Sequence, residues 1–377
     1  MSTTTETTRP ALWLRCETKE FERRTALTPA AAKMLVESGF DVFVERDEQR
    51  IFDDVEYERV GCTLKENNSW PSAPAHIPII GLKELPASTS PLPHTHIYFA
   101  HCYKRQAGWA DVLARFHAGG GTLYDLEFLT DARGRRVAAF GFHAGFAGAA
   151  AGALAFAEQA RGNNSRLGPL RSFDNEHDLV SAVKASLGGS AKNVKALVIG
   201  ALGRCGHGAV DLFRKIGLDE DNIVKWDLDE TAKGGPFPEI LDVDIFVNCV
   251  YLSTSIPPFL TIAQLQSADA TTRRLRVVVD VSCDTANPHN PIPIYSVNTT
   301  FSRPTVDVDV GVGSPELTVV SIDHLPTLLP REASEQFSND LLPSLLEFPR
   351  RKEERVWVNA EKLFREKMLE AMSEKGL

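Results

Sequence analysis

The sequence predicts an α/β protein with two Rossmann-like domains, largely parallel sheets and an active-site cleft between the domains. Short apolar runs alternate with helical stretches from Ala11 onward, which is typical of βαβ units. In the second half, several runs are apolar almost throughout, as expected for parallel strands buried on both faces. The chain has 377 residues, which is more than one hydrophobic core usually needs.

The first domain is expected to be discontinuous, to comprise residues 1–137 and 330–377, and to bind the substrate. Residues 138–329 are expected to form the second domain. The segment after Pro330 contains two amphipathic helical patterns, whose apolar faces need a surface to cover. We therefore expect the two C-terminal helices to dock back on the first domain.

Local signals predict the elements of the first domain. ALWLRCET and FDVFVE are expected strands. Between them, TPAAAKMLVESG predicts a helix with Thr28 as N-cap, Pro29 at the first position and Gly39 after the end. IPIIGLKE, HIYFAHC and TLYDLEF are further expected strands.

The segment 137–157 reaches the length of about 20 residues that a bilayer crossing requires. It consists mostly of Ala and Gly, which add little insertion energy, and His143 interrupts it. It therefore predicts a buried helix that packs closely through small residues.

A glycine-rich loop lies near the start of the second domain. NVKALVIGALGRCGHGAVDLFRKIG predicts a strand, a turn and a helix, the context in which backbone N–H groups bind a phosphate. The spacing of Gly200, Gly203, Gly206 and Gly208 departs from GxGxxG, so the glycines alone are a weak signal. Further strands are expected at NIVKWDLDE, VDIFVNCVYLS, LRVVVDVSC and LTVVSIDHL.

Asp227 strengthens the prediction of a dinucleotide site. It ends the next expected strand, where a carboxylate accepts hydrogen bonds from the adenosine ribose and repels a 2′-phosphate. NAD is therefore favoured over NADP, and Arg204 in the loop is expected near the pyrophosphate. Asp229 is a competing candidate, and a solvated acidic turn beside tightly packed glycines is the alternative without a ligand.

Lys83 and His101 end two of the apolar runs of the first domain, and ligands of open α/β folds lie at the carboxyl ends of strands. Histidine titrates near neutrality, and burial or a neighbouring cation turns a lysine into a base. Together they can move two protons in sequence. Glu17, Glu84 and Glu127 lie beside them or end strands. The alternative is that Lys83 and His101 are surface groups or satisfied polar residues.

The charge distribution favours a small anionic substrate. The net charge of -9 and the pI near 5.6 argue against nucleic acid or an acidic membrane as the main partner. Basic residues nevertheless gather in the first domain, where guanidinium groups suit a substrate with several carboxylates. The GRR run can also be a solvated turn. The basic residues are Arg23, Arg24, Lys104, Arg105, Arg133, Arg135 and Arg136.

The six cysteines occur singly, without CxxC or zinc-ligand spacing, so we expect a reducing compartment and no metal. Cys205 and Cys249 lie near the expected cofactor loop, either as buried thiols or as a pair close enough to cross-link. The N-terminus lacks the basic and apolar regions of a secretory signal.

Several longer runs go beyond general pattern. They are RCETKEFERRTALTP, GLKELP, FAHCYKRQAGW, GTLYDLEFL, GRRVAAFGF, GALGRCGHGA, DVDIFVNCVYLS, VVDVSCDTANPHNPIPIY and SIDHLPTLLPREAS. Together they resemble one family, the fungal saccharopine dehydrogenases that use NAD and form lysine. The resemblance extends from Leu12 to the C-terminal helices. It implies oxidative deamination of saccharopine with NAD and water to L-lysine, 2-oxoglutarate and NADH.

The resemblance also implies roles for single residues. Lys83 matches the base that takes the proton of the secondary amine, and His101 matches the acid–base group that activates water. Glu84 and Glu127 match acidic neighbours that tune both. Residues that match substrate contacts are Arg24, Gln106, Arg136, Phe140, Asp280, Val281 and Ser282. Residues that match NAD contacts are Gly203, Arg204, Asp227, Thr231, Tyr251, Val279, Arg135, Ile322, Asp323, His324 and Leu325.

Cys205 and Cys249 match a pair that can form a disulfide in the family. Some relatives end in a peroxisomal tripeptide, whereas this sequence ends in EKGL, so we expect the cytoplasm. A monomer is expected.

Two other functions are considered. An enzyme like alanine dehydrogenase shares the E…E.R.ALTP run and the use of lysine and histidine, but the FAHCYK and YDLEF runs and the surplus of arginines disfavour it. A regulatory NAD-binding protein without turnover would have no need of two matched acid–base groups.

Overall fold

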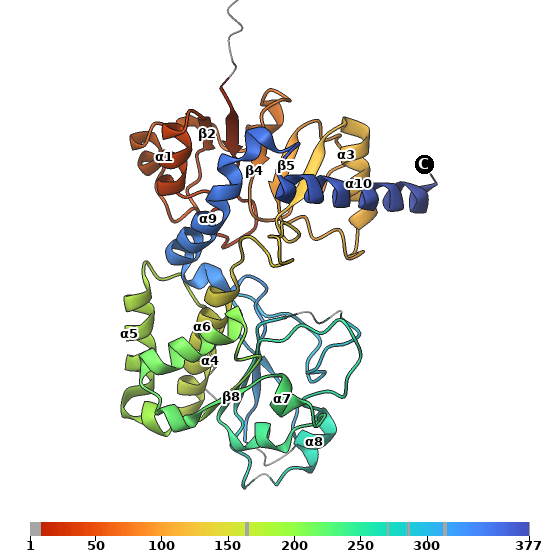
Figure 1. Ribbon diagram of the computed structural model, residues 1–377. Helices are drawn as coiled ribbons and strands as arrows, with labels where there is room; N and C mark the ends of the chain where they lie inside the picture. Colours follow the sequence, from red (N-terminus) through yellow and green to blue (C-terminus); the bar gives the residue numbers. More distant parts are fainter. Residues whose placement is uncertain are drawn as a thin grey trace, which may run out of the picture. The chain divides into compact units, whose positions relative to one another are not determined.

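The computed structural model describes residues 9–162, 166–269, 271–283, 285, 287–311 and 315–376. The chain divides into two compact units, which we call unit 1 (Met1–Ala139 with Pro330–Leu377) and unit 2 (Phe140–Leu329) (Figure 1). Each unit contains a six-stranded sheet. The α/β class and the largely parallel sheets predicted from the sequence are confirmed.

The sheet of unit 1 has the order β3-β2-β1-β4-β5-β6, and its neighbouring strands are all parallel. The order changes direction between β1 and β4, and ligands of such folds bind beside that point, at the carboxyl ends of the strands. The strands are β1 (Ala11–Leu14), β2 (Asp41–Glu45), β3 (Thr63–Lys65), β4 (Ile79–Ile80), β5 (Thr95–Tyr98) and β6 (Thr122–Asp125).

The helices of unit 1 come from both ends of the chain. The predicted cap of the first helix is confirmed: Thr28 Oγ accepts the N–H of Ala31 at 3.3 Å, and Gly39 follows the helix with a φ of 94°. The helices are α1 (Pro29–Glu37), α2 (Asp54–Arg59), α3 (Trp109–Gly119), α9 (Pro330–Leu346) and α10 (Arg355–Lys375), with short 3₁₀ turns η1 (Trp70–Ser72) and η6 (Phe348–Arg350).

The two C-terminal helices are fastened to the N-terminal part of unit 1 by buried hydrogen bonds. The N–H groups of Thr25 and Thr28 donate to the hydroxyls of Ser334 and Ser338 on α9, each at 3.0 Å. On α10, Glu361 accepts the hydroxyl of Tyr124 at 3.1 Å. These bonds join segments more than 230 residues apart in the sequence.

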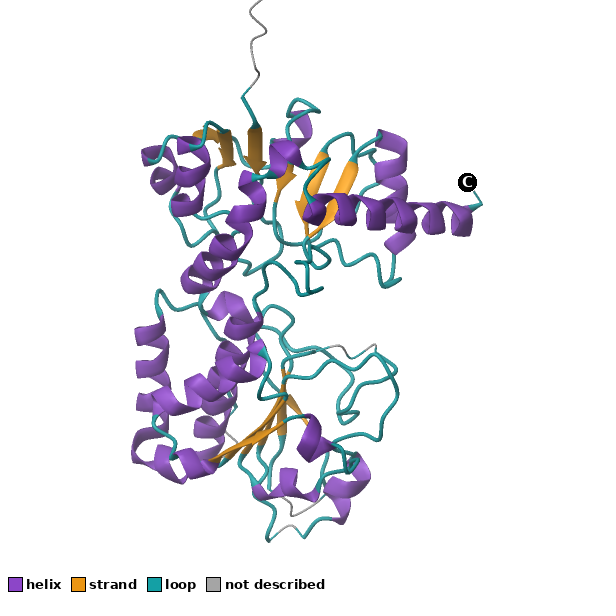
Figure 2. Ribbon diagram, viewed as in Figure 1, coloured by secondary structure: helices purple, strands orange, loops and turns teal. Residues whose placement is uncertain are grey.

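The sheet of unit 2 has the order β11-β12-β10-β9-β7-β8, and only the pair β11–β12 is antiparallel among the described strands. Helices lie on both sides of these strands (Figure 2). The strands are β7 (Ala196–Ile199), β8 (Ile223–Trp226), β9 (Ile245–Asn248), β10 (Val277–Asp280), β11 (Val306–Asp307) and β12 (Thr318–Val320). The helices are α4 (Gly141–Ala160), α5 (Glu176–Leu187), α6 (Arg204–Ile216), α7 (Leu228–Thr231) and α8 (Ile262–Ser267), with 3₁₀ turns η2 (Gly188–Asn193), η3 (Glu220–Asn222), η4 (Pro238–Asp242) and η5 (Leu325–Leu328).

The Ala/Gly helix α4 packs against α6 with almost no space between the two backbones. A Cβ on Gly145 would lie 1.8 Å from the carbonyl oxygen of Cys205, and one on Gly208 would lie 1.9 Å from that of Phe142. The prediction of a buried helix that packs through small residues is therefore confirmed. Among the described residues, no helix combines the length and apolar content that a bilayer crossing needs.

Candidate active site

Lys83 and His101 follow two neighbouring parallel strands of unit 1. Ile80 on β4 lies beside Ile97 on β5, so the loops after these strands leave the sheet side by side. The strands end at Ile80 and Tyr98. The sequence predicted that the lysine and the histidine end the strands, which is wrong by three residues, because the regular pairing stops earlier than the apolar runs. Both residues still lie at the carboxyl edge of the sheet, where ligands bind.

His101 is paired with Glu84. Its Nδ1 contacts Oε1 of Glu84, and its ring stacks on that of Phe99 at 6.1 Å between centroids. Burial would raise the pKa of Glu84, but the hydrogen bond from His101 and the charge of Lys83 lower it to about 2. Glu84 is therefore a carboxylate near neutral pH and can only accept. Nδ1 of His101 must donate, so the lone pair of the neutral ring lies on Nε2.

Glu127, two residues after β6, is hydrogen-bonded to a second group of predicted residues. Its Oε1 accepts Nζ of Lys104 and a guanidinium nitrogen of Arg136, each at 2.8 Å. Burial would raise the pKa of Glu127, but the hydrogen bond from Lys104 and the charge of Arg136 lower it. The side chain of Gln106 accepts the N–H of Lys104 at 3.1 Å. Thus the structure brings Glu127, Arg136 and Gln106 together around one lysine.

Arg24, predicted to bind a substrate carboxylate, forms a buried bidentate ion pair with Glu22. The two bonds measure 2.7 and 2.6 Å, and the side chains are 6% and 0% exposed. The pair fixes the plane of the guanidinium group. Glu22 was missed by the sequence reasoning, although its position two residues before Arg24 was a signal that could have found it.

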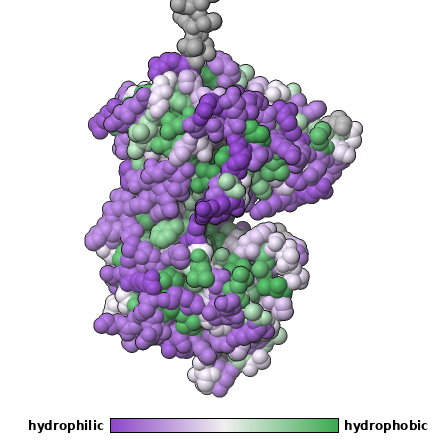
Figure 3. Space-filling model, in the orientation of Figure 1, coloured by the Kyte–Doolittle hydropathy of each residue, from purple (hydrophilic) through white to green (hydrophobic). Residues whose placement is uncertain are grey.

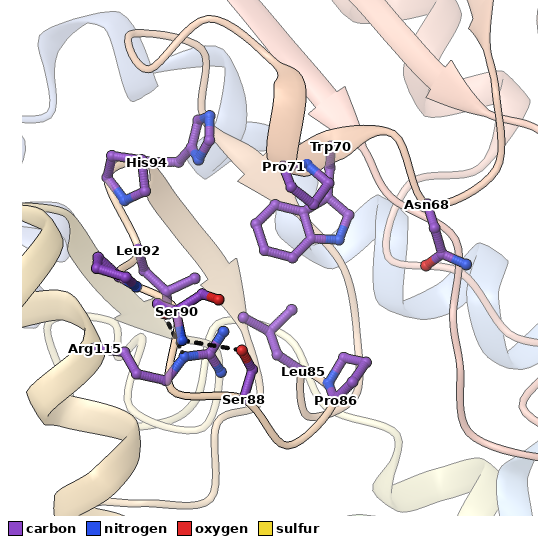
Figure 4. Close-up of a pocket in the computed structure, with 12 residues that line it drawn as sticks. Asn68, Trp70, Pro71, Leu85, Pro86, Ser88, Ser90, Leu92, His94 and Arg115 are labelled. Atoms are coloured by element: carbon purple, nitrogen blue, oxygen red, sulfur yellow. Dashed lines mark hydrogen bonds between the residues drawn. The ribbon is translucent and has the colours of Figure 1, made fainter.

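A cavity of about 730 Å³ in unit 1 is lined by Glu84, His101 and Gln106. A smaller cavity of about 260 Å³ shares Arg115 with it and has walls that include Trp70 (Figure 4). None of the predicted site residues lines the smaller cavity. The larger one is therefore the cavity that His101 and Glu84 border.

In unit 2, the loop between β7 and α6 has the form of a phosphate site. Gly200 has a φ of 84°, which favours glycine. A Cβ on Gly206 would lie 2.2 Å from the carbonyl oxygen of Gly200, so α6 begins directly against the loop. Gly203 is the N-cap of this 13-residue helix. The N–H groups of the first turn, which have no partner within a helix, and the helix dipole favour an anion here.

Asp227 lies beside that loop, where an adenosine ribose is expected. Its carboxylate accepts the N–H of Leu202 at 2.9 Å and that of Leu228 at 3.0 Å. Thr231 donates its hydroxyl to the carbonyl oxygen of Asp227 at 2.7 Å. Apolar surface is visible on this unit (Figure 3), and Leu202, Leu228 and Tyr251 are 75%, 81% and 49% exposed. The glycine loop, the acidic residue and the exposed apolar side chains together fit NAD.

The other residues predicted to contact NAD differ in accessibility. The side chains of Val279, Ile322 and Leu325 are buried in the core of unit 2, so only their backbones could contact a ligand. His324 is buried against the ring of Phe301, 5.0 Å between centroids.

Three further NAD candidates are exposed. Asp323 lies at the surface of unit 2. Arg135 belongs to unit 1, where its guanidinium group is paired with Asp131 at 3.1 Å. Arg204 begins α6.

Asp280, predicted to contact the substrate, is the centre of a buried polar network. It accepts bonds from Asn248 at 3.0 Å, the hydroxyl of Ser282 at 2.6 Å and that of Tyr295 at 2.7 Å. Burial and the charge of Asp280 raise the pKa of Tyr295. The sequence reasoning missed Asn248 and Tyr295. Val281 is half-buried in this segment, whereas Phe140 is the N-cap of α4 in the same unit.

Cys205 and Cys249 are both thiols in the structure. A hydrogen bond with Cys205 and burial raise the pKa of the Cys249 thiol, so the two side chains are neighbours. The disulfide stays a prediction.

Unit 1 thus carries a lysine and a histidine at the edge of a parallel sheet, and unit 2 carries a glycine-rich loop before a helix with an acidic residue beside it. These features define an NAD-dependent dehydrogenase of the two-unit Rossmann-like type.

Residues 13–147 match the family described as alanine dehydrogenase/PNT, N-terminal domain. The fold resembles that of an L-alanine dehydrogenase, with a TM-score of 0.62 and 15% identity over 94% of both chains. It also resembles a transhydrogenase from Sinorhizobium meliloti, with a TM-score of 0.58 and 17% identity over 90% of this chain and 94% of the other.

Sequence relatives identify the family. A saccharopine dehydrogenase (NAD(+), L-lysine-forming) of Yarrowia lipolytica is 57% identical over 94% of this chain and 96% of its own. The enzyme of the same name from Schizosaccharomyces pombe is 56% identical over 94% and 97%. The chain therefore belongs to the family of NAD-dependent, L-lysine-forming saccharopine dehydrogenases, and the resemblance found in the sequence is confirmed.

Proposed function

We propose that the protein oxidises saccharopine with NAD and water to L-lysine, 2-oxoglutarate and NADH, with Lys83 and His101 as the acid–base groups. The observation that carries this proposal is that Lys83 and the His101–Glu84 pair lie in adjacent loops after β4 and β5, in a chain of this family. The chain is an NAD-dependent oxidoreductase, and the assignment of single residues to steps is the part that we propose.

Lys83 is the base for the oxidation step. NAD, which Gly203, Arg204 and Asp227 would hold, would supply the acceptor for the hydride of the substrate carbon on the glutarate side. Lys83 takes the proton of the secondary amine, which leaves an imine between the two halves of the substrate. Lys83 is only 6% exposed, and burial disfavours the charged form of a lysine. Glu84 is next to it in the sequence, and its negative charge opposes that effect.

His101 is the acid–base group for hydrolysis. Nε2 takes a proton from the water that attacks the imine carbon, and returns a proton to nitrogen when the carbon–nitrogen bond of the carbinolamine breaks. Glu84 supports this role because it holds Nδ1 as a donor and stabilises the imidazolium that forms. His101→Gln is expected to cost less than loss of Lys83, since water partly substitutes.

Arginines of unit 1 are proposed to bind the substrate carboxylates, and the loop of unit 2 is proposed to bind NAD. Arg24 and Arg136 are already oriented by Glu22 and Glu127, so their guanidinium planes are set before a substrate arrives. Gly203, Arg204 and Asp227 are proposed to contact the cofactor. Binding of the substrate in a cleft between the two domains also stays a prediction.

The decisive experiment follows NADH absorbance after purified protein and NAD are mixed with saccharopine, L-alanine or L-glutamate, each repeated with NADP. Turnover with saccharopine and NAD alone is expected. Turnover with alanine would instead support an alanine dehydrogenase. Binding of NAD without turnover of any substrate would support a regulatory protein.

The cytoplasm and a monomeric state are proposed as well. Analytical ultracentrifugation of the purified protein tests the monomer, and a concentration-dependent rise in the sedimentation coefficient would contradict it. Imaging of the tagged full chain in a fungal cell tests the location.

A further inference from the structure

The loops that carry Lys83 and His101 are each held by a buried carboxylate. Glu17, in the loop after β1, holds the first, and Asp125, at the end of β6, holds the second. We propose that Glu17 and Asp125 are positioning residues, which fix the backbones of these two loops so that the acid–base side chains keep their geometry. This inference rests on the proposed function, because it concerns the same two groups.

Glu17 holds the backbone on both sides of the Leu82–Lys83 peptide bond. Its Oε1 accepts the N–H of Leu82 at 2.6 Å, and its Oε2 accepts that of Lys83 at 2.9 Å. Arg15 completes the arrangement, since one guanidinium nitrogen bonds Glu17 at 3.3 Å and the other donates to the carbonyl oxygen of Lys83. The side chains of Arg15 and Glu17 are 1% and 5% exposed. Both backbone polar groups of Lys83 are thus bound by one buried ion pair.

Gly81 makes room for this ion pair. A Cβ at this position would lie 2.4 Å from Nε of Arg15, closer than any non-bonded contact allows. The run GLKE therefore needs a glycine at position 81, because the buried guanidinium group of Arg15 occupies the space of a side chain. Lys83 lies two residues after this glycine.

Asp125 holds the loop of His101 by one hydrogen bond and its own loop by another. Its Oδ2 accepts the N–H of Ala100 at 3.3 Å, and its Oδ1 accepts that of Glu127 at 2.9 Å. Ala100 directly precedes His101, whose φ of 48° is unusual for a residue with a side chain. Asp125 is 1% exposed. It therefore ties the histidine loop to the loop that carries Glu127.

The sheet order explains why these two carboxylates are matched. Within the order β1-β4-β5-β6, the loops of Lys83 and His101 follow β4 and β5. Glu17 lies in the loop after β1, beside β4, and Asp125 ends β6, beside β5. A carboxylate has two acceptor oxygens, whereas an amide of the same shape has one acceptor and one donor. Each carboxylate here uses its two oxygens on two different N–H groups, so only a carboxylate satisfies both.

Isosteric variants provide the test. In Glu17→Gln and Asp125→Asn, an NH₂ group faces a backbone N–H, so one of the two bonds is lost and replaced by repulsion. Asp244→Asn is the matched control, because this buried aspartate of unit 2 accepts the N–H of Lys195 at 2.8 Å, away from both catalytic loops. For each protein we would measure melting temperature, kcat, KM for NAD, and the pH dependence of kcat/KM with saccharopine.

The two test variants are expected to lower kcat by about ten- to a hundredfold, as small displacements of reacting groups do, and to shift the acidic limb of the pH profile. KM for NAD should stay within a factor of two, as an order-of-magnitude expectation for a site in the other unit. Asp244→Asn should lower the melting temperature alone. Wild-type kcat and an unchanged pH profile in both test variants would overturn the inference. If a variant does not fold, Glu17→Asp or Asp125→Glu replaces it, and retains both oxygens at a shifted position.

A second readout does not depend on turnover. The imidazole resonance of His101, identified by its loss in His101→Gln, is titrated by proton NMR in the wild type and in Asp125→Asn. A changed titration midpoint supports the positioning role even if saccharopine proves to be the wrong substrate, and an unchanged midpoint together with unchanged kinetics contradicts it. Absence of saccharopine turnover in the wild type would count against the proposed function alone.

Discussion

The two units build similar parallel sheets and equip the carboxyl edges of these sheets in opposite ways. In unit 1, the edge carries charged side chains that bond one another, such as Glu84 with His101 and Glu127 with Lys104. In unit 2, the edge carries glycines, and the first turn of α6 starts against the carbonyl oxygen of Gly200. The first edge presents side chains, whereas the loop between β7 and α6 on the second edge presents backbone.

This difference follows from what each edge has to do. Proton transfer needs side chains whose charge and direction are controlled by neighbours at hydrogen-bond distance. Phosphate binding needs backbone N–H groups that a ligand can approach closely, so every added methyl group is an obstacle. We therefore expect unit 1 to be sensitive to changes of charge at constant shape, and unit 2 to be sensitive to added volume at constant charge.

The largest effect is expected for Lys83→Met, which removes the proposed base and keeps an apolar chain of similar length. We expect kcat to fall by about a hundred- to ten-thousandfold, with NAD affinity unchanged. Steady-state kinetics and NAD titration measure the two quantities. Lys65→Met is the control, since Lys65 on β3 lies over the Trp13 ring at 5.6 Å and has no proposed role. A folded Lys83→Met protein with undiminished turnover would refute the assignment.

In unit 2, Gly206→Ala adds one methyl group and no charge. The new Cβ would lie 2.2 Å from the carbonyl oxygen of Gly200, so the loop must move, at a cost of about 1–3 kcal/mol. We expect NAD affinity to fall by about tenfold or more and the melting temperature to drop. Calorimetric titration with NAD measures the first. Gly189→Ala, where a Cβ meets nothing within 4 Å, should change neither, and equal behaviour of the two variants would contradict the proposed phosphate loop.

Asp227→Ser tests the acidic group that the edge of unit 2 is proposed to use. Serine still caps α7, but it neither holds both ribose hydroxyls nor repels a 2′-phosphate. Hydrogen bonds to a charged group contribute about 1.5–3 kcal/mol, so the preference for NAD over NADP should fall by about ten- to a hundredfold. The ratio of kcat/KM for the two cofactors measures it. If Asp229→Ser changes the ratio and Asp227→Ser does not, the neighbouring aspartate is the ribose partner.

Much of this fold was predicted from local signals, each contained within a short stretch of sequence. Thr28 and Gly39 marked the ends of α1, and the Ala/Gly run predicted the buried helix α4, because caps and small-residue packing are encoded locally. The α/β class followed from the alternation of apolar runs and helices. The apolar runs were less informative about strand ends: β4 has only two paired residues, Ile79 and Ile80, although the run extends further.

The candidate site was less predictable because its partners are distant in the chain. Asn248 and Asp280 meet only when β9 and β10 pair, 32 residues apart. Asp125 is an ordinary acidic residue in a strand until the N–H groups of Ala100 and Glu127 point at it. No local sequence pattern contains this information. The resemblance to a family identified the residues that are expected to bind ligands, but it did not identify positioning residues such as Asp125 and Asn248.

The smallest effect is expected for Glu84→Gln, and it concerns the pH dependence of the free energy of unfolding. Since the folded pKa of Glu84 is lowered from 4.5 to about 2, its carboxylate contributes stability above the unfolded pKa, and this contribution is lost as pH falls toward about 2. The side chain is 45% exposed, so water screens much of the interaction. The difference in unfolding free energy between wild type and Glu84→Gln should therefore be modest and constant above pH 5, and should shrink from there to pH 3. Urea unfolding of both proteins across this range measures the difference, with Glu58→Gln on exposed α2 as the control. If the difference in unfolding free energy stays constant down to pH 3, the pair of Glu84 and His101 does not stabilise the folded protein.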